Sequence, residues 1–488
     1  MMKECTAAVH HGAAENTKGN ILRFLRLTRK TVRAVVLALA TLLTGVQPDG
    51  AAATNRHVIV ISIDALRPEF CMPGSASNAC PTLAALRERG CCARRVAPVY
   101  PSLTYPGHAS IVTGVTPARH GVTGNAVFDP FSGEDGRGFW YASDVKAAAL
   151  WDIVHKAGCS VGAVSWPCTA GAEGITWNLP EFWGSQEGNE ATMIRRYASR
   201  EVLDLLERAV LPLTTETLTD AARRDEFVAA CTREIIKQKQ PDLMLIHLLE
   251  ADHHQHKNGR SSPGLPAVMS RIDAAVGGIV AAIEKAGLSD RTTFIVTGDH
   301  GFGDVDRSLV PNVLLRRAGF IAVADGRVTA WAAMAQNLGG SAAVYINPQS
   351  STGTLDTVQA LLEKHSRNAD GVRLYSIIDK ESLVKIGGPA CAAFCLEAET
   401  GYMFSGSWRG DSLVSRSRLK GNHGYLPTKP DMATGFIICG NGIRKGVVLE
   451  QMSLVDIAPT IAVLFGLRPG NMEGRILREV LTEAEDLR

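Results

Sequence analysis

The sequence predicts an α/β protein with a doubly wound, mostly parallel central sheet flanked by helices. Short apolar runs rich in β-branched residues alternate with helical patterns along the chain. This alternation is typical of buried parallel strands that are joined by crossover helices. The chain has 488 residues, of which 45% are hydrophobic, and this length allows one large α/β domain or two to three smaller ones.

The expected strands are five apolar runs, at 57–63, 161–166, 242–249, 292–297 and 434–440. Helical patterns separate them, at 81–89, 148–157, 266–286 and 456–465. Residues 186–240 are charged and helical, and we interpret them as a cap or lid insertion. Residues 340–415 have a β-α-β-α-β pattern of their own, which predicts a small inserted α+β subdomain. The main domain is then expected to comprise 54–339 and 416–488.

The first 53 residues have the features of a targeting segment. A basic stretch precedes an uncharged apolar run at 34–46, and small residues follow at 51–53. This order is typical of a secretory signal peptide, and the run is shorter than the about 20 residues that a membrane span needs. We expect an exported protein, periplasmic or secreted, that begins near Thr54 and has no stable membrane span after signal cleavage. The alternative is an N-terminal anchor that leaves the protein facing outside the cytoplasm.

The net charge bears on possible partners, and the cysteine spacing bears on possible disulfides. A net charge of +2 argues against a nucleic-acid polymer as partner, because such proteins usually carry a basic excess. Three cysteine pairs are close in sequence: Cys71/Cys80, Cys159/Cys168 and Cys391/Cys395. Both disulfides of an exported protein and buried free thiols are compatible with this spacing. The sequence leaves the oligomeric state open.

Acidic residues and histidines follow three of the predicted strands. Asp64 follows the first, Asp252 and His256 follow the third, and Asp299 and His300 follow the fourth. In open α/β sheets the carboxyl ends of the strands form the ligand site, so these side chains should converge. Clustered carboxylates are costly to bury unless cations compensate them. A mixed Asp and His set favours Zn²⁺, Mn or Fe over Ca or Mg.

Two further features support a metal site with a nucleophile. Asp252 and His256 are four residues apart, which places both on one face of a helix, and His423 in a glycine-flanked loop is a candidate to complete the set. Prolines and a glycine flank Ser102 and Thr104. Thr104 precedes a helical pattern, and a helix N-terminus can bind a phosphate through its unpaired N–H groups. A helix-capping role for this hydroxyl is the alternative.

The ordered motifs resemble the nucleotide pyrophosphatase/phosphodiesterase family, the type I phosphodiesterases of the alkaline phosphatase superfamily. The motifs are Asp64, Pro-Ser-Leu-Thr-Tyr-Pro-Gly-His at 101–108, Thr-Gly-x-x-Pro-x-x-His-Gly-x-x-x-Asn at 113–125, Asp252-x-x-x-His256, Thr-Gly-Asp-His-Gly at 297–301 and Asn-His-Gly at 422–424. They extend over roughly residues 55–475. The resemblance implies an alkaline phosphatase-like fold and hydrolysis of phosphodiester or phosphoanhydride bonds through a phosphothreonine intermediate. The implied substrate is a small phosphoester, such as a nucleotide or nucleotide derivative.

The resemblance also implies roles for individual residues. One metal ion would be held by Asp64, Thr104, Asp299 and His300, with Thr104 also the nucleophile, and a second by Asp252, His256 and His423. Both ions are expected to be Zn²⁺, with Mn or Fe as alternatives. Asn125 would donate to a phosphoryl oxygen. Tyr105 would stack on a nucleotide base, and Trp183 would form the opposite wall or pack in the core.

Other interpretations remain open. A phosphonoacetate-type hydrolase or a phosphomonoesterase would use the same scaffold and metals, and a catalytically inactive metal-binding homologue is a third interpretation. Four histidines lie near the motifs but outside their pattern, and we interpret them as supporting or surface groups: His108, His247, His253 and His254. Arg67 and Lys146 are candidate substrate contacts between which the sequence does not choose.

Overall fold

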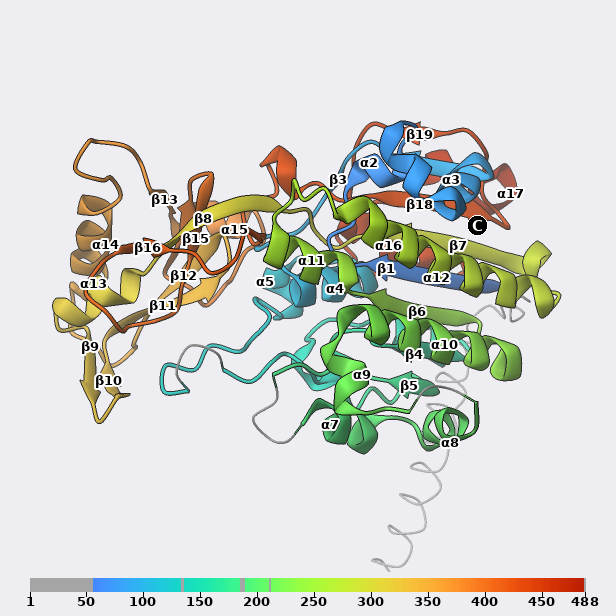
Figure 1. Cartoon of the computed structure of the whole chain (residues 1–488), viewed down its shortest axis with the longest axis horizontal. Coiled ribbons are helices and arrows are strands. Elements are labelled where there is room, and N and C mark those ends of the chain that lie inside the picture. Colours follow the sequence, from blue (N-terminus) through green and yellow to red (C-terminus); the bar gives the residue numbers. More distant parts are fainter. Residues whose placement is uncertain (1–55, 133–135, 185–188, 210–211, 487–488) are drawn as a thin grey trace, which may run out of the picture. The chain divides into compact units, whose positions relative to one another are not determined.

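A central sheet of eight strands organises the part of the chain that the computed structural model describes, residues 56–132, 136–184, 189–209 and 212–486 (Figure 1). The signal peptide or anchor expected over 1–53 lies outside these residues. The strand order is β19 (Val448–Leu449), β2 (Gly90–Ala93), β18 (Phe436–Gly440), β7 (Thr292–Thr297), β1 (His57–Ile63), β6 (Leu243–Leu248), β4 (Val161–Val164) and β5 (Trp177–Leu179).

The sheet is mixed but mostly parallel. β7, β1, β6, β4 and β5 run parallel to one another, whereas β18 runs antiparallel to both β7 and β2. The expectation that 434–440 forms a parallel strand is therefore wrong. The chain leaves the sheet at the end of β7 and returns at the same edge as β18, with Phe436 beside Thr297. A strand that re-enters where its neighbour ended has to run back along it.

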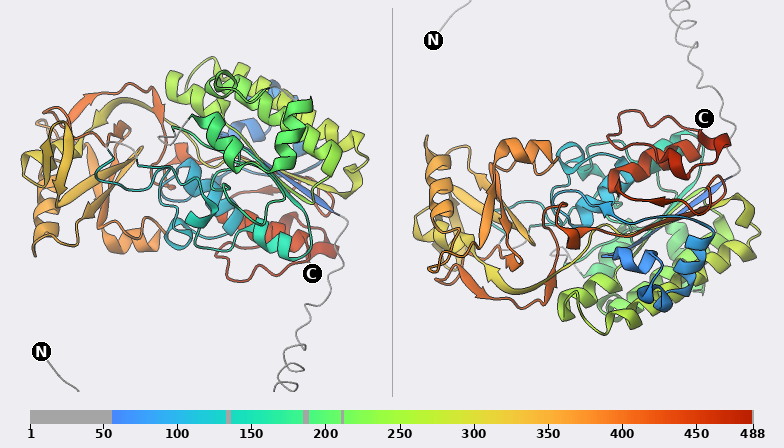
Figure 2. Two further views of the ribbon diagram at one scale, coloured as in Figure 1. Left: turned by 90° about the horizontal axis from the view of Figure 1, so that it is seen from below. Right: turned by 90° about the horizontal axis from the view of Figure 1, so that it is seen from above.

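Helices cover both faces of the sheet (Figure 2). On one face, α3 (Pro81–Glu88), α10 (Ala221–Lys239) and α12 (Leu265–Lys285) share a core with alternate residues of β1. On the other face α4 (Thr104–Thr113), α6 (Leu150–Lys156) and α16 (Ile457–Leu464) share a second core. Because β1 is buried on both faces, its sequence is continuously apolar rather than alternating.

The helix α12 also has the length and apolar composition of a membrane span. Its apolar residues recur with helical period and are buried against α10 and α3. These properties equally suit a core helix, which is the place that α12 has here.

A second sheet forms after β7. It has the order β11 (Ala333–Leu338), β12 (Ser341–Ile346), β14 (Phe394–Ala398) and β13 (Tyr375–Ile378), all antiparallel, with α14 (Thr354–Lys364) and α15 (Lys380–Lys385) between its strands. Beside it, β8 (Gly303–Leu309) pairs with β15 (Gly401–Phe404), β16 (Val414–Arg416) and β17 (Gly421–Asn422). This α+β unit begins before residue 340, because β11 belongs to it.

The charged segment at 186–240 contains α7 (Glu190–Tyr197), α8 (Arg200–Ala209), α9 (Thr215–Thr219) and α10. α10 packs against α12 and β6, so it belongs to the helical layer of the main sheet. α9 packs against α10 and α7. A cap function for this segment remains a prediction.

All ten cysteines of the described residues are free thiols, and nine of them are buried. The close pairs at Cys71/Cys80, Cys159/Cys168 and Cys391/Cys395 are therefore unlinked in this structure. Burial raises the pKa of the Cys80 thiol to about 12, so this sulfur stays protonated and packs as an apolar group.

Candidate active site

The candidate site lies where β1, β6 and β7 end and α4 begins. Asp64 follows β1 directly, and Asp299 and His300 follow β7. α11 (Glu250–Asn258) starts just after β6 and carries Asp252 and His256. The carboxyl ends of parallel strands thus bring together side chains that are far apart in sequence, as expected for an α/β sheet.

One group of donor atoms surrounds the imidazole of His300. Its Nε2 lies 3.4 Å from Asp64 Oδ1, 3.3 Å from Asp299 Oδ2 and 3.4 Å from Thr104 Oγ1. These are the four residues that the resemblance assigned to the first metal ion. All four are buried in the free protein.

A second group adjoins the first. Asp252 Oδ2 lies 3.4 Å from His256 Nε2, and Asp252 Oδ1 lies 3.5 Å from His423 Nε2. The rings of His423 and His300 stack with centroids 3.7 Å apart. Donor atoms of Asp252, His300 and His423 lie within 4.8 Å of one another, as do those of Asp64, Asp299 and His300. The two groups are therefore contiguous, and His300 reaches both.

The three histidines share one hydrogen-bonding pattern. Each Nδ1 faces a backbone carbonyl: His300 that of Gly301 at 3.1 Å, His256 that of Gly421 at 3.1 Å, and His423 that of Ser102 at 3.0 Å. Since a carbonyl only accepts, each Nδ1 donates its proton, and the Nε2 lone pair is left to face the cluster. This second hydrogen bond is the arrangement by which proteins orient metal-binding imidazoles.

The carboxylates each leave an oxygen for the cluster. Asp64 Oδ1, Asp252 Oδ1 and Asp299 Oδ2 are buried and have no hydrogen-bond partner among the described residues. Burial, together with Asp299 and Asp252, raises the pKa of Asp64 well above its usual value. Burial also lowers the pKa of His423 well below its usual value, so this ring is neutral. Unpartnered carboxylate oxygens beside imidazole nitrogens fit divalent cations, and the Asp and His set suits Zn²⁺, Mn or Fe.

Thr104 occupies the first turn of α4, and its hydroxyl does not cap the helix. The N-cap residue is Leu103, whose side chain offers no acceptor, so the capping alternative is wrong. The neighbouring Ser102 is committed elsewhere, because its Oγ donates to the carbonyl of Tyr425 at 2.8 Å. Thr104 is therefore the hydroxyl that faces the donor cluster.

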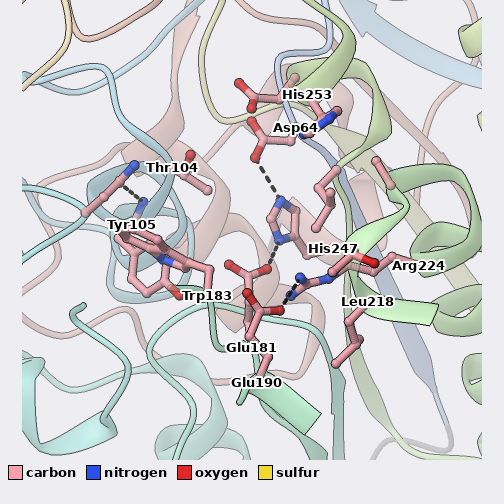
Figure 3. A pocket seen from close by; sticks show the side chains of 15 residues that line it. Asp64, Thr104, Tyr105, Glu181, Trp183, Glu190, Leu218, Arg224, His247 and His253 are labelled. Carbon is pink, nitrogen blue, oxygen red and sulfur yellow. Dashed lines mark hydrogen bonds and ion pairs between the residues drawn. The ribbon is translucent and has the colours of Figure 1, made fainter. Parts of the chain in front are cut away.

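A pocket of about 410 Å³ opens beside Thr104 (Figure 3). Its lining includes Asp64, Thr104, Asn125, Asp252, Tyr105, Trp183, Glu181, Glu190, Leu218, Arg224, His247 and His253. The side-chain Oδ1 of Asn125 accepts a hydrogen bond from the backbone N–H of Tyr105 at 3.0 Å. The amide Nδ2 is then the part of Asn125 that is left to donate to a ligand.

The two aromatic side chains of the pocket lie edge to face. The rings of Tyr105 and Trp183 have centroids 6.3 Å apart and planes inclined by 67°. They contact each other rather than facing across a gap. Tyr105 is 1% exposed, whereas Trp183 is only partly buried, so the indole is the more accessible of the two. A base-binding role for either ring remains a prediction.

The structure adds residues that the motifs did not single out. His247, interpreted above as a supporting or surface group, is buried and bridges Asp64 and Glu181, and Arg224 binds Glu190 across the pocket wall. Burial opposes a charge on His247, but Glu181 and Asp64 raise its pKa well above the usual value. In the sequence, only the position of His247 near the end of a predicted strand indicated that it could lie at the site, and nothing indicated this for Glu181.

Two candidate substrate contacts lie elsewhere. Arg67 bonds Glu69 and the carbonyl of Arg260, and Lys146 donates to the carbonyl of Ser143. Neither belongs to the described lining of the pocket. His108 is fully buried beside Trp166, and His254 contacts Ser262.

Comparison with known proteins agrees with the motifs and the fold. Residues 58–426 match the model of the type I phosphodiesterase / nucleotide pyrophosphatase family, and the chain belongs to this family. An uncharacterized pyrophosphatase/phosphodiesterase of Schizosaccharomyces pombe is 24% identical over 52% of this chain and 46% of its own length. Human ectonucleotide pyrophosphatase/phosphodiesterase family member 1 is 25% identical over 50% of this chain and 23% of its own length. The chain thus spans less than half the length of these two relatives.

Other relatives match over more of their length. Human ectonucleotide pyrophosphatase/phosphodiesterase family member 7 is 22% identical over 91% of this chain and 87% of its own length. The structure of murine ectonucleotide pyrophosphatase/phosphodiesterase 5, in an inactive form in complex with AMP, is 20% identical. It superposes with a TM-score of 0.61 and covers 88% of this chain and 100% of its own. The chain therefore has the fold of these enzymes.

Proposed function

We propose that the protein is a metal-dependent phosphodiesterase or nucleotide pyrophosphatase that hydrolyses phosphodiester or phosphoanhydride bonds through a phosphothreonine intermediate. The observation that carries this proposal is the convergence of three imidazole Nε2 atoms and three unpartnered carboxylate oxygens beside the hydroxyl of Thr104. A purely structural cluster of buried carboxylates would be costly.

The two groups of donors are the proposed metal sites. Asp64, Thr104, Asp299 and His300 would hold one ion, and Asp252, His256 and His423 the other. Two divalent cations there would lower the pKa of a hydroxyl and stabilise the attacking and leaving oxygens of an in-line displacement. Zn²⁺ is the expected ion, with Mn or Fe as alternatives.

The protein's own residues then account for two steps. Thr104 Oγ1 attacks phosphorus, so that a Thr–O–P bond forms while the bond to the leaving alcohol or nucleotide breaks, and the leaving oxygen takes up a proton. Water next attacks phosphorus, the Thr–O–P bond breaks, Thr104 Oγ1 regains a proton, and the remaining phosphate monoester is released. Asn125 Nδ2 donates to a phosphoryl oxygen in both steps, and the N-terminus of α4 favours the negative charge.

The charges of the pocket favour a diester over a monoester. A monoester carries additional negative charge, which calls for an uncommitted cation. Arg224 binds Glu190 at 3.0 Å and the carbonyl of Phe182, and His247 is held between two carboxylates. The described lining thus keeps its buried cations engaged, which disfavours the phosphomonoesterase alternative. A nucleotide or nucleotide derivative is the proposed substrate class.

We also infer export to the periplasm or the medium, on the strength of the signal-like order of residues 1–53. A nucleic-acid polymer is not an expected partner at a net charge of +2.

A paired rate assay tests the proposal. Purified protein with added Zn²⁺ is given thymidine 5′-monophosphate p-nitrophenyl ester and p-nitrophenyl phosphate, with Thr104→Ala as the blank. We expect a kcat/KM at least about a hundredfold higher for the diester, which corresponds to about 2.7 kcal/mol in the transition state. Preference for the monoester would contradict the proposal in favour of a phosphomonoesterase. No turnover of either substrate would direct attention to phosphonates and then to an inactive metal-binding protein.

A further inference from the structure

A buried carboxylate–imidazole–carboxylate chain lies behind the first proposed metal site (Figure 3). His247 Nε2 is 3.2 Å from Asp64 Oδ2, and His247 Nδ1 is 2.8 Å from Glu181 Oε2. The same Nδ1 is 3.2 Å from the carbonyl of Ser165. His247 is 1% exposed and Glu181 is 5% exposed, so both side chains are buried at the wall of the pocket.

The strand order explains why the ring lies there. β6 runs between β1 and β4, and His247 is in register with Ser62 of β1. Asp64 follows β1, Ser165 follows β4, and Glu181 follows β5 at the next position in the sheet. A side chain near the end of β6 is thus flanked by acceptors on both sides. Each ring nitrogen therefore faces at least one acceptor, and the ring is held from both sides.

This series of hydrogen bonds gives the two carboxylate oxygens of Asp64 different partners. Oδ2 is held by His247, whereas Oδ1 is buried without a hydrogen-bond partner among the described residues and faces His300 Nε2 at 3.4 Å. The hydrogen bond therefore fixes the carboxylate with Oδ1 directed toward the donor cluster. The two oxygens of Asp299 differ in the same way. Its Oδ1 accepts from the backbone N–H groups of Ala65 and His300, whereas its Oδ2 has no hydrogen-bond partner among the described residues.

We propose that Glu181 and His247 are positioning residues that orient Asp64 for the metal ion of the Thr104 site. This inference rests on the proposed metal-dependent function. Glu181 acts only through His247, because its carboxylate holds the ring at Nδ1. Partners of this kind typically change metal affinity by about 10- to 100-fold when they are removed.

The test measures the affinity for Zn²⁺ rather than activity. Metal-free protein carrying Asp252→Asn, which weakens the other proposed site, is titrated with Zn²⁺ against a chromophoric chelator. We expect Glu181→Gln, which keeps the side chain's shape and removes its charge, to raise the Kd of the remaining site by about 10- to 100-fold. Glu181→Asp, with a shorter reach, should give a smaller rise and serves if the glutamine variant does not fold.

Two matched controls separate positioning from general damage. Asp273 is a buried carboxylate on α12 that accepts from the backbone of Thr82 and Leu83, and Asp273→Asn should leave the Kd unchanged. His57, at the opposite end of the sheet, is a buried imidazole that faces the carbonyl of Pro241, and His57→Gln controls for His247→Gln. In the His247→Gln background, adding Glu181→Gln should have no further effect, because the link between Glu181 and Asp64 is already broken.

The outcomes separate this inference from the proposed function. An unchanged Kd in Glu181→Gln, or an effect that persists fully without His247, would overturn the positioning role even if the wild-type protein hydrolyses diesters. The expected rise in Kd, with no phosphoester turnover by the wild type, would uphold the positioning role and reject the hydrolase. A wild-type protein that binds no Zn²⁺ would overturn both.

Discussion

At the scale of single residues, the chemistry of the site depends on which nitrogen of each histidine is committed to the backbone. The Nδ1 atoms of His256, His300 and His423 all donate to carbonyls, and two of those carbonyls belong to Gly421 and Gly301. Backbone acceptors do not titrate, so this orientation is retained at any pH at which the fold persists. The proposed ligand atoms are therefore oriented before any cation binds.

Asn125 offers a direct test of the phosphoryl contact. Asn125→Ala should lower kcat for a diester by about 10²–10³, because one oxyanion donor typically contributes that factor. Steady-state kinetics with the nitrophenyl diester provide the measurement. Asn125→Asp is the matched variant, since it keeps an acceptor for the N–H of Tyr105 but removes the donor. A loss confined to the alanine variant would mean that Asn125 only supports the backbone.

Gly301 follows His300 and has no room for a side chain. A Cβ there would lie 2.1 Å from the carbonyl oxygen of Asp431 and 2.7 Å from that of Ala433. Gly301→Ala should therefore displace the loop that carries His300, destabilise the protein by about 1–3 kcal/mol and reduce the bound Zn²⁺. Denaturant unfolding and metal analysis check both effects. Gly287→Ala is the control. Gly287 has a positive φ, which strains an alanine, but a Cβ there would meet no atom within 4 Å. The metal content of this variant should therefore stay normal.

At the scale of elements, the orientation of α11 matters most, because it carries two proposed ligands. Its N-cap residue is Leu249, which cannot cap it. Asp225 of α10 supplies the acceptor instead: its carboxylate accepts from the backbone N–H of Leu249 at 2.8 Å and of Glu250 at 3.0 Å. A residue from one helix thus fixes the start of another, at the point where β6 enters the site.

Removing this acceptor should loosen α11. Asp225→Ala leaves two buried N–H groups unpaired, each of which costs about 1–3 kcal/mol, so the free energy of unfolding should fall by a few kcal/mol. Denaturant unfolding measures the loss. Asp225→Asn keeps a carbonyl acceptor and should lose less; equal losses would argue against the capping role.

The same residue predicts a pH dependence of stability. Burial, more than any other factor, raises the pKa of Asp225 from 3.8 to about 7 in the folded protein. The folded state therefore binds this proton more tightly than the unfolded state between about pH 4 and 7. Over that window the free energy of unfolding should fall with rising pH, by up to about 1.4 kcal/mol per unit from this group. The amide of the Asp225→Asn variant does not titrate, so the difference between wild type and variant should isolate the slope. A flat difference curve would contradict it.

At the scale of the whole molecule, the site joins distant parts of the chain. Asp64 precedes the main helical layers, and His423 arrives only after the second sheet, by way of β8 and β17. β17 pairs with β8 next to Gly303, so the excursion returns to where it began. Cations at the cluster would link the end of β1 with this returning loop.

Metal removal should consequently lower stability. A ligand that binds only the folded state at a hundred times its Kd contributes about 2.7 kcal/mol, and the metal-free site retains mutually repelling carboxylates. We expect chelation to lower the Tm and added Zn²⁺ to restore it, as followed by calorimetry. Asp299→Asn should show a smaller response than wild type. A Tm that is unaffected by chelator in metal-loaded protein would contradict a two-ion site.

Local pattern sufficed for much of the fold. The apolar runs at 57–63 and 292–297 became β1 and β7 with the expected bounds, because burial on both faces requires continuously apolar strands. The motif positions after these strands also converge, because parallel strands end at one edge. The family and its fold follow from the same motifs.

The sequence by itself determined which motif residues meet at this edge, since strand ends and motif spacing are local properties. Only the tertiary structure decided how they meet. The direction of β18 depends on where a long excursion re-enters the sheet, and the edge-on contact of Tyr105 with Trp183 depends on packing between distant loops. The bridge from Glu181 through His247 to Asp64 depends on the order of β5, β4, β6 and β1. Lateral strand order arises from long-range pairing, which leaves no periodic signal in the residues themselves.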